Sequence, residues 1–319
     1  MSSEFDAASP EQRPGLLRAV TDPVAAEFFA DQRHSAAWLP CSDLSIPELA
    51  SCALLLMIKD EDDIIYENLE HHYRLGFRRF FVMDNASTDG TSGLVAAFRA
   101  ARPDAVVFSC FDPVAGYYQE IKMNALQAFA QSYLAHEDLP VDWIFFVDAD
   151  EFITCCSADT GRAKSAFQAV LADRDKKMMI FHWVQCASEQ LITNLDVNYQ
   201  PMATFSRRWR KLVPSVPKVA FRGNHDIQTT QGNHTPATYP FAINQSVVMA
   251  EAGFYVLHYP MRSVDQLRKK IVNGGRAYEA CSKLRSDFGG HWKYYYGLYQ
   301  QHGDATLSHL LREHIEGCA

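Results

Sequence analysis

Short apolar runs alternate with helix-length segments through the first half of the chain. The runs cover residues 53–58, 80–83, 105–110 and 143–147. A short continuous apolar run suits a strand that is buried on both faces, as in a parallel sheet between helices. The alternation predicts successive βαβ units with right-handed crossovers. We therefore expect an α/β fold with a Rossmann-like, mostly parallel sheet flanked by helices.

The segments between these runs carry helix signals. Residues 62–75 open with acidic side chains, which favour a helix N-terminus, and Gly76 follows as a C-terminal stop. Further helices are expected at 90–101 and 117–135. Each of these helices would connect two strands of the sheet.

The second half of the chain has a less regular pattern. We expect a helix near 164–172, strands at 178–184, 247–250 and 254–258, an irregular stretch at 193–245, and a helix at 263–284. The predicted organisation is an N-terminal extension at 1–50 that packs on the core, a main domain at 51–260, and a helical C-terminal extension at 261–319.

The composition limits the possible partners. With 319 residues, of which 48% are apolar, the chain can bury a large core. Its net charge of −8 offers no general attraction for nucleic acid, so no nucleic-acid partner is expected and any phosphate must be bound locally. No apolar stretch is long enough to cross a bilayer, and the first residues contain no secretion signal. We expect a cytoplasmic protein without a transmembrane segment, with a peripheral position at the inner face of the membrane as an option.

Acidic groups follow three of the apolar runs, at 59–61, 84–89 and 148–151. Ligands bind at the carboxyl ends of strands in parallel sheets, so these groups are expected at one edge. In an extended segment, alternation directs Asp148 and Asp150 to the same side, where both could hold one Mn²⁺ or Mg²⁺ ion. A solvated turn is the alternative, and the apolar run before the pair favours the metal site.

The segment 83–91 is the second signal. Asp84, Asn85 and Asp89 could be simple turn and N-cap residues. Their position after a predicted strand favours a role in ligand binding instead.

Three segments combine into one larger pattern. They are Lys59-Asp60-Glu61 before a helix that carries His71 and His72, the segment 84–91, and Phe146-Val147-Asp148-Ala149-Asp150-Glu151-Phe152. Together they resemble the family 2-like glycosyltransferases of the GT-A fold, which carry a D-x-D motif. The resemblance implies transfer of a sugar, with inversion, from a nucleotide sugar to a glycan or lipid-linked glycan. A UDP-sugar is the first expectation for the donor, and a surface polysaccharide for the product.

The resemblance also implies a nucleotide-binding half at 51–153 and an acceptor half at 154–260. In that family the first two acidic loops hold the nucleoside, and the D-x-D motif holds Mg²⁺ or Mn²⁺ on the diphosphate. The implied nucleotide-sugar ligands are Lys59, Glu61, Asp84, Asn85, Asp89, Lys122, Asp148, Arg262 and Lys270.

The metal ligands implied by the resemblance are Asp148, Asp150 and His258. His258 belongs to Leu257-His258-Tyr259, which is similar to a C-terminal segment of related enzymes where a histidine completes the metal or diphosphate site. His258 could equally be a hydrogen-bonded structural residue. The basic residues that follow could equally form a solvated helix face.

This chemistry suits the residue types. A divalent cation stabilises the negative charge that develops on a leaving nucleoside diphosphate. The sequence contains no Walker A motif and no G-x-G-x-x-G, so a metal bridge is the available means of holding phosphate. An inverting reaction also needs a general base. Glu189 and Asp226 are the candidates, with Glu189 preferred, and either could be an exposed loop acid.

Two other functions stay open. Gly223-Asn224-His225-Asp226 resembles an element of binuclear metallophosphoesterases, although their other motifs are missing. The lack of a clear base leaves a non-catalytic nucleotide- or sugar-binding module as the second alternative. The basic run at 207–211, with Trp209 inside it, could bind an anionic or lipid-linked glycan acceptor, or could be simply solvated.

Overall fold

The fold is known from a computed structural model. It describes residues 41, 43–114, 116, 118–196, 199–208, 217–223, 227–238, 241–280 and 290–318. The predicted N-terminal extension therefore falls largely outside the described residues.

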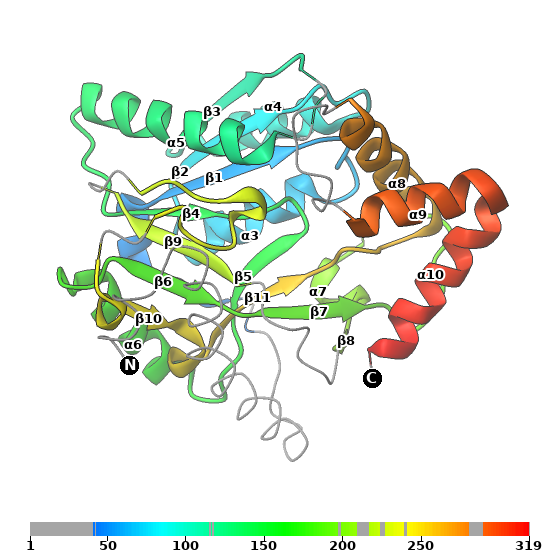
Figure 1. The fold of residues 1–319 in the computed structure, drawn as a ribbon. Coiled ribbons are helices and arrows are strands. Elements are labelled where there is room, and N and C mark those ends of the chain that lie inside the picture. The colour runs from blue at the N-terminus through cyan, green and yellow to red at the C-terminus, as the bar shows by residue number, and fades with distance from the viewer. Residues whose placement is uncertain are drawn as a thin grey trace.

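A seven-stranded sheet forms the centre of the molecule (Figure 1). Its order is β10 (Ser246–Val248), β6 (Met178–Phe181), β9 (Lys218–Arg222), β4 (Trp143–Phe146), β1 (Ala53–Ile58), β2 (Arg79–Asp84) and β3 (Val106–Phe111). All neighbouring pairs are parallel except those that involve β9, which runs antiparallel to β4 and β6. The predicted α/β fold with a mostly parallel sheet flanked by helices is confirmed.

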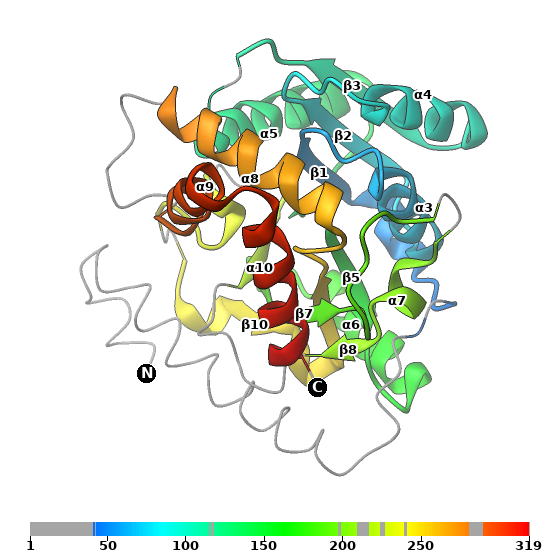
Figure 2. The same cartoon turned by 90° about the vertical axis from the view of Figure 1, so that its right-hand side faces the viewer.

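Helices cover both faces of this sheet. The connections use α3 (Ile65–Leu75), α4 (Thr91–Ala101), α5 (Gln119–His136) and α6 (Thr160–Ala172). Figure 2 shows α5 on one side of β1 and β2, and α3 and α4 on the other. Helix α3 ends at Leu75, and Gly76 follows it as the predicted stop, with φ of +134°. A side chain there would lie 2.1 Å from the carbonyl oxygen of Ile46, so only glycine fits.

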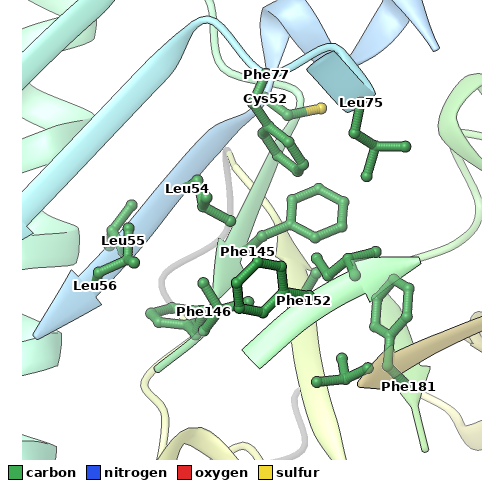
Figure 3. Close-up of a cluster of buried hydrophobic side chains, with 14 of the residues drawn as sticks. Cys52, Leu54, Leu55, Leu56, Leu75, Phe77, Phe145, Phe146, Phe152 and Phe181 are labelled. Carbon is green, nitrogen blue, oxygen red and sulfur yellow. The ribbon is translucent and has the colours of Figure 1, made fainter. Parts of the chain in front are cut away.

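The core lies where β1 and β4 meet the second sheet (Figure 3). Leu54, Leu55 and Leu56 on β1 are fully buried. The ring of Phe145, on β4, packs edge-on against Phe77 with centroids 5.0 Å apart. Burial of each such side chain stabilises the fold by about 1.5–3 kcal/mol. The strands that carry the acidic segments are thus held rigidly.

A second, four-stranded sheet has the order β5 (Glu151–Cys155), β11 (Phe254–His258), β7 (Trp183–Ala187) and β8 (Arg207–Arg208). β11 pairs antiparallel with β5 and parallel with β7. Because β5 begins only five positions after β4 ends, the chain crosses from one sheet to the other at the D-x-D segment.

The C-terminal helices are α8 (Val264–Glu279), α9 (Gly290–His302) and α10 (Asp304–Gly317). They lie together at one side of the molecule, in orange and red in Figures 1 and 2. Leu267 and Ile271 of α8 pack with Leu307 and Leu311 of α10. None of the helices in the described part of the chain is long and apolar enough to cross a membrane.

Several element boundaries differ from the sequence predictions. The strand predicted at 178–184 is broken at His182 into β6 and β7, which belong to different sheets. The region 193–245, which was predicted to be irregular, contains β9 in the middle of the seven-stranded sheet. The charged residues at its two ends, Lys218 and Arg222, obscured the strand pattern. The strand β5 was not predicted, because it follows the acidic turn directly and gave no separate strand signal. The strand predicted at 247–250 ends at Val248.

Candidate functional site

The D-x-D segment forms a tight turn between the two sheets. The N–H of Glu151 donates to the carbonyl of Asp148 (3.1 Å), and the side chain of Glu151 accepts from the N–H of Asp148 (2.8 Å). Asn68, on α3, donates to the carbonyls of Ala149 (2.9 Å) and Glu151 (2.8 Å). The prediction that the D-x-D residues are extended is therefore wrong, since they form a turn. Asp150 is buried, Asp148 is half-buried, and the two carboxylates face different partners.

Asp148 accepts hydrogen bonds from two neighbouring elements. Lys218 Nζ, on β9, lies 2.8 Å from Asp148 Oδ2 and 3.1 Å from Glu151 Oε2. Gln119 Nε2, at the start of α5, lies 3.0 Å from Asp148 Oδ1. Burial lowers the pKa of Lys218, but the two carboxylates outweigh burial and raise it. The ammonium group therefore stays charged although Lys218 is only 1% exposed.

Asp150 lies among basic side chains from β11, from the segment that leads into α8 and from α8 itself. Lys270 Nζ contacts Asp150 Oδ2, and His258 Nε2 and Arg262 Nη1 lie 3.5 Å and 3.7 Å from the same oxygen. Burial raises the pKa of Asp150, but Lys270, His258 and Arg262 outweigh burial and hold it well below its usual range. Asp150 is thus a buried carboxylate that stays ionised because of its partners.

His258, the last residue of β11, is held between Asp150 and Trp183. The indole of Trp183 stacks on its ring, with centroids 4.4 Å apart and planes 26° apart. Burial lowers the pKa of His258, although Asp150 opposes this, so the ring is neutral at pH 7. Its Nδ1 is buried and has no hydrogen-bond partner among the described residues. A neutral imidazole is the form that binds a metal ion.

Arg262 is fully buried and joins the first acidic loop to the D-x-D turn. Its Nε and Nη2 donate to the two oxygens of Asp63, both at 2.7 Å. Nη2 also lies 2.5 Å from Glu61 Oε2, and Nη1 donates to the carbonyl of Tyr259 (3.0 Å). These contacts occupy all three guanidinium nitrogens, so Arg262 orders the loop around it in this conformation.

Helix α8 also holds the loops after β1 and β2. Asn273 donates to Asp60 Oδ2 (2.6 Å), and Lys269 Nζ bridges Asp62 (2.9 Å) and Asp89 (3.1 Å). Lys269 is one of the basic residues after His258 for which a solvated helix face was the alternative. The contacts show that it connects the two loops.

Asp84, at the end of β2, has the role of a turn residue. Its Oδ1 accepts from the N–H of Ser87 (2.8 Å), and its Oδ2 accepts from the hydroxyl of Ser92. Asp84 is 5% exposed. In this conformation its carboxylate shapes the loop before α4.

Asn85 and two lysines link the ends of β1, β2 and β3. Lys122 Nζ, on α5, lies 2.7 Å from Asn85 Oδ1 and 2.6 Å from Asp112 Oδ2. Lys59 Nζ donates to the backbone carbonyls of Asn85 (3.3 Å) and Ala86 (2.7 Å). The predicted ligands Lys59, Asn85 and Lys122 therefore lie together at one edge of the sheet.

A cavity of about 490 Å³ opens beside this cluster. It is lined by Met83, Asp112, Val114, Tyr118, Ile121, Lys122 and Ala125. An aromatic ring, an acid and a buried base line a mostly apolar hollow at the carboxyl ends of β2 and β3. That volume is within the range of small-molecule sites in proteins.

Two glutamates of the site have strongly raised pKa values. Burial raises the pKa of Glu61 to about 7, against the opposing charges of Arg262 and Lys270. Burial raises the pKa of Glu151 to about 8, against the opposing charge of Lys218. A protonated Glu151 lowers the negative charge around Asp148 and Asp150 near neutral pH.

The three predicted metal ligands are only partly gathered. Within the described ranges, no three His, Cys, Asp or Glu side chains are grouped so that they could already hold a metal ion. Carboxylates and a neutral imidazole suit Mn²⁺ or Mg²⁺ as donor types, and His258 Nε2 faces the carboxylate of Asp150. Lys218 and Lys270 would have to release Asp148 and Asp150 before a cation could bind.

The two predicted bases do not join this cluster. Glu189 is exposed beyond the end of β7, and no hydrogen bond among the described residues connects it to Asp148 or Asp150. Asp226 lies outside the described residues, as do Asn224 and His225, so the hydrolase motif is also untested. The same holds for the centre of the basic run at 209–211.

Sequence reasoning missed Asn68, Gln119, Trp183 and Lys218. Trp183 stands in a short apolar strand, where an aromatic residue gives no functional signal. Asn68 and Gln119 lie on helices whose rotation toward the D-x-D turn cannot be read from the chain. A lysine inside the apolar run 217–221 was the one clue available.

Comparisons with known proteins give little further guidance. No protein-family model matches the chain, and no curated protein matches it. Among solved structures, 43 chains are similar. One is a mannosyltransferase, PcManGT from Pyrobaculum calidifontis, in complex with GDP-Man and Mn²⁺. The alignment covers 92% of this chain and 83% of that one at 14% identity, with a TM-score of 0.32. Similarity this low does not transfer a function.

Proposed function

We propose that the protein is a nucleotide-sugar-dependent glycosyltransferase. The observation that carries the proposal is the meeting of the three acidic segments at one edge of the sheet. Arg262 contacts Glu61, Asp63 and Asp150, so a single buried side chain ties the first loop to the D-x-D turn. Chemistry at the carboxyl ends of parallel strands is the general expectation for such sheets.

The edge near Asn85 and Lys122 would bind the nucleoside. The cavity beside Lys122 offers Tyr118 for contact with a base and Asp112 as a hydrogen-bond acceptor. We propose a UDP-sugar as the first donor to test, because the sequence resemblance favours it.

The corner around Asp148 and Asp150 would hold the diphosphate. Lys218 and Lys270 bring two ammonium groups to this corner. In our proposal, both exchange a carboxylate for a phosphate oxygen when the donor binds. Asp148, Asp150 and His258 would hold Mn²⁺ or Mg²⁺. When bound, that cation supplies Lewis-acid stabilisation of the leaving diphosphate.

The acceptor is proposed to be a glycan or lipid-linked glycan that enters from the side of β7. Inversion would need a base to take the proton from the acceptor hydroxyl. We propose Glu189 or Asp226 for this role. The exposed position of Glu189 is suitable only if the acceptor covers it, since a base acts at hydrogen-bond distance.

The test is turnover of radiolabelled nucleotide sugars with Mn²⁺, comparing the native chain with Asp150→Asn. We expect the variant to lose at least about a hundredfold in kcat/KM, because electrostatic stabilisation of this kind supplies that much. Asp175→Asn, which changes an exposed loop acid, is the matched control and should keep full activity.

Equal turnover by Asp150→Asn and Asp175→Asn would contradict the proposed site. Release of phosphate from simple esters without sugar transfer would favour the hydrolase. Tight nucleotide binding without any turnover would favour the non-catalytic module.

A further inference from the structure

We propose that Trp183, the 3-10 turn Gln231–Asn233 and His258 form the subsite for the sugar of the donor. This inference rests on the proposed function and adds to it the part of the site that recognises an uncharged, hydroxyl-rich group. Nothing in the sequence motifs assigns these residues, apart from His258 as a predicted metal ligand.

The first observation is a set of buried polar atoms without partners. Asn233 is fully buried, and neither its Oδ1 nor its Nδ2 has a hydrogen-bond partner in the described part of the chain. The same is true there of Trp183 Nε1, Gln231 Nε2 and His258 Nδ1. An unsatisfied buried polar group is costly, so most such groups in proteins have a partner. A polar ligand placed next to such atoms would supply the missing donors and acceptors.

The second observation is the place of these residues beside the D-x-D turn. Trp183 stacks on His258, whose Nε2 lies 3.5 Å from Asp150 Oδ2. Lys218 Nζ lies 5.6 Å from the centroid of Trp183 and 2.8 Å from Asp148 Oδ2. Trp183 is therefore one side chain away from each carboxylate. In a nucleotide sugar, the sugar is attached directly to the diphosphate, so a group next to the diphosphate corner meets the sugar.

The third observation is that the turn Gln231–Asn233 is fixed in place. The carbonyl of Gly232 accepts from Lys218 Nζ (2.8 Å), and its N–H donates to Gln119 Oε1 (3.1 Å). Gln119 and Lys218 are the two side chains that hold Asp148. The backbone of Asn233 is left-handed, with φ of +58°. Residues held in this sparsely populated backbone region are concentrated at ligand-binding and active sites.

The residue types suit a sugar better than a phosphate or a second cation. The amides of Gln231 and Asn233 and the indole N–H of Trp183 are neutral groups that can pair with hydroxyls. The buried, unpartnered Nδ1 of His258 can also pair with a hydroxyl. A site built to pair with hydroxyl groups also rejects ligands that lack them.

The experiment compares binding of a nucleoside diphosphate with binding of its sugar derivative, by calorimetry with Mn²⁺. The probes are UDP with UDP-glucose and UDP-galactose, and GDP with GDP-mannose. Two variants remove hydrogen bonds with little change of shape. Trp183→Phe keeps an aromatic ring on His258 and removes the N–H. Asn233→Gly removes the amide and keeps a backbone that accepts a positive φ. Asp138→Gly, at an exposed position with φ of +55°, is the matched control.

We expect each variant to weaken binding of the preferred nucleotide sugar about tenfold, which is the effect of one lost hydrogen bond. Binding of the nucleoside diphosphate should stay within about twofold, and Asp138→Gly should change neither. Thermal unfolding would verify that the variants are folded. If Asn233→Gly does not fold, Trp183→Phe alone still tests the proposal.

Three results would overturn the subsite. One is an equal loss for the diphosphate and its sugar derivative, and another is no loss in either variant. The third is a changed KM for the acceptor with unchanged donor binding. These outcomes leave the proposed glycosyltransferase intact. A native chain that binds no nucleotide and transfers no sugar would instead overturn the proposed function.

Discussion

At the residue scale, each D-x-D carboxylate has its own lysine. Lys218 holds Asp148 and Lys270 holds Asp150, and both ammonium groups are largely buried. An ion pair in such a place is hard to break without a new partner for both charges. The diphosphate of a donor could accept the lysines while a divalent cation takes the carboxylates. Metal binding and donor binding are therefore expected to depend on each other.

Replacement of Lys270 tests this exchange. Lys270→Met should bind Mn²⁺ at least about tenfold more tightly than the native chain in the absence of nucleotide, since Asp150 no longer has an ammonium partner. The free Mn²⁺ signal in electron paramagnetic resonance measures this affinity. Lys176→Met, which removes an exposed hydrogen bond to the carbonyl of Asn244, is the control and should leave Mn²⁺ affinity unchanged. Equal affinities in all three proteins would exclude competition by Lys270.

At the element scale, α8 determines how the loops of the site are arranged. The segment that leads into α8 carries Arg262, and α8 itself carries Lys269, Lys270 and Asn273. These side chains contact the loop after β1, the loop after β2 and the D-x-D turn. A helix near the C-terminus thus completes a site whose sequence motifs all lie in the first half of the chain.

The pairs that buried Arg262 makes with half-buried Asp63 and Glu61 give a prediction about stability. Arg262→Gln should lower the free energy of unfolding by about 2–3 kcal/mol, because it removes the counter-charge and hydrogen bonds of two partly desolvated carboxylates. Arg268→Gln, which breaks the surface pairs with Asp265 and Asp304, should cost no more than about 1 kcal/mol. Urea unfolding measures both. A stable Arg262→Gln protein with weakened nucleotide binding would instead make Arg262 a diphosphate ligand.

At the scale of the whole molecule, two sheets are joined through one turn. Glu151 begins the second sheet, and its carboxylate contacts Lys218 of the first. Any change in the charge of Glu151 therefore affects the contact between the two sheets. The pH dependence of the free energy of unfolding thus tests this buried contact.

Burial raises the pKa of Glu151 from 4.5 to about 8. Between these values the folded protein holds a proton that the unfolded chain has lost, so stability falls as pH rises. Below about pH 6.5 the buried histidines act in the opposite direction, because their pKa values are lowered. The clear window is therefore pH 6.5 to 8.

Glu151→Gln cannot titrate, so it should not show this loss. Between pH 6.5 and 8 the native chain should lose about 1.5 kcal/mol of stability relative to the variant. Urea unfolding at several pH values measures the difference, and Glu137→Gln, at an exposed position, should behave like the native chain. Parallel pH profiles for the native chain and Glu151→Gln would show that Glu151 is ionised throughout.

The strands and helices of the first half could be predicted from the sequence because each depends on a local pattern. The apolar runs of β1, β2, β3 and β4, the helices between them and the stop at Gly76 all follow from burial and backbone preference. The order of these strands places the acidic segments at one edge, so the location of the candidate site was also predictable.

The partners of the acidic residues were decided only by the tertiary structure. Lys218 comes from an antiparallel strand inserted between β4 and β6, and Lys270 from a helix far along the chain. Their contacts depend on how two sheets and a distant helix pack, which no local pattern encodes. The same packing turned an expected extended D-x-D pair into a tight turn, because Asn68 and Glu151 bind its backbone. The sequence by itself determined which residues are acidic, and local burial preferences determined where their strands end. Long-range packing determined which charges face them.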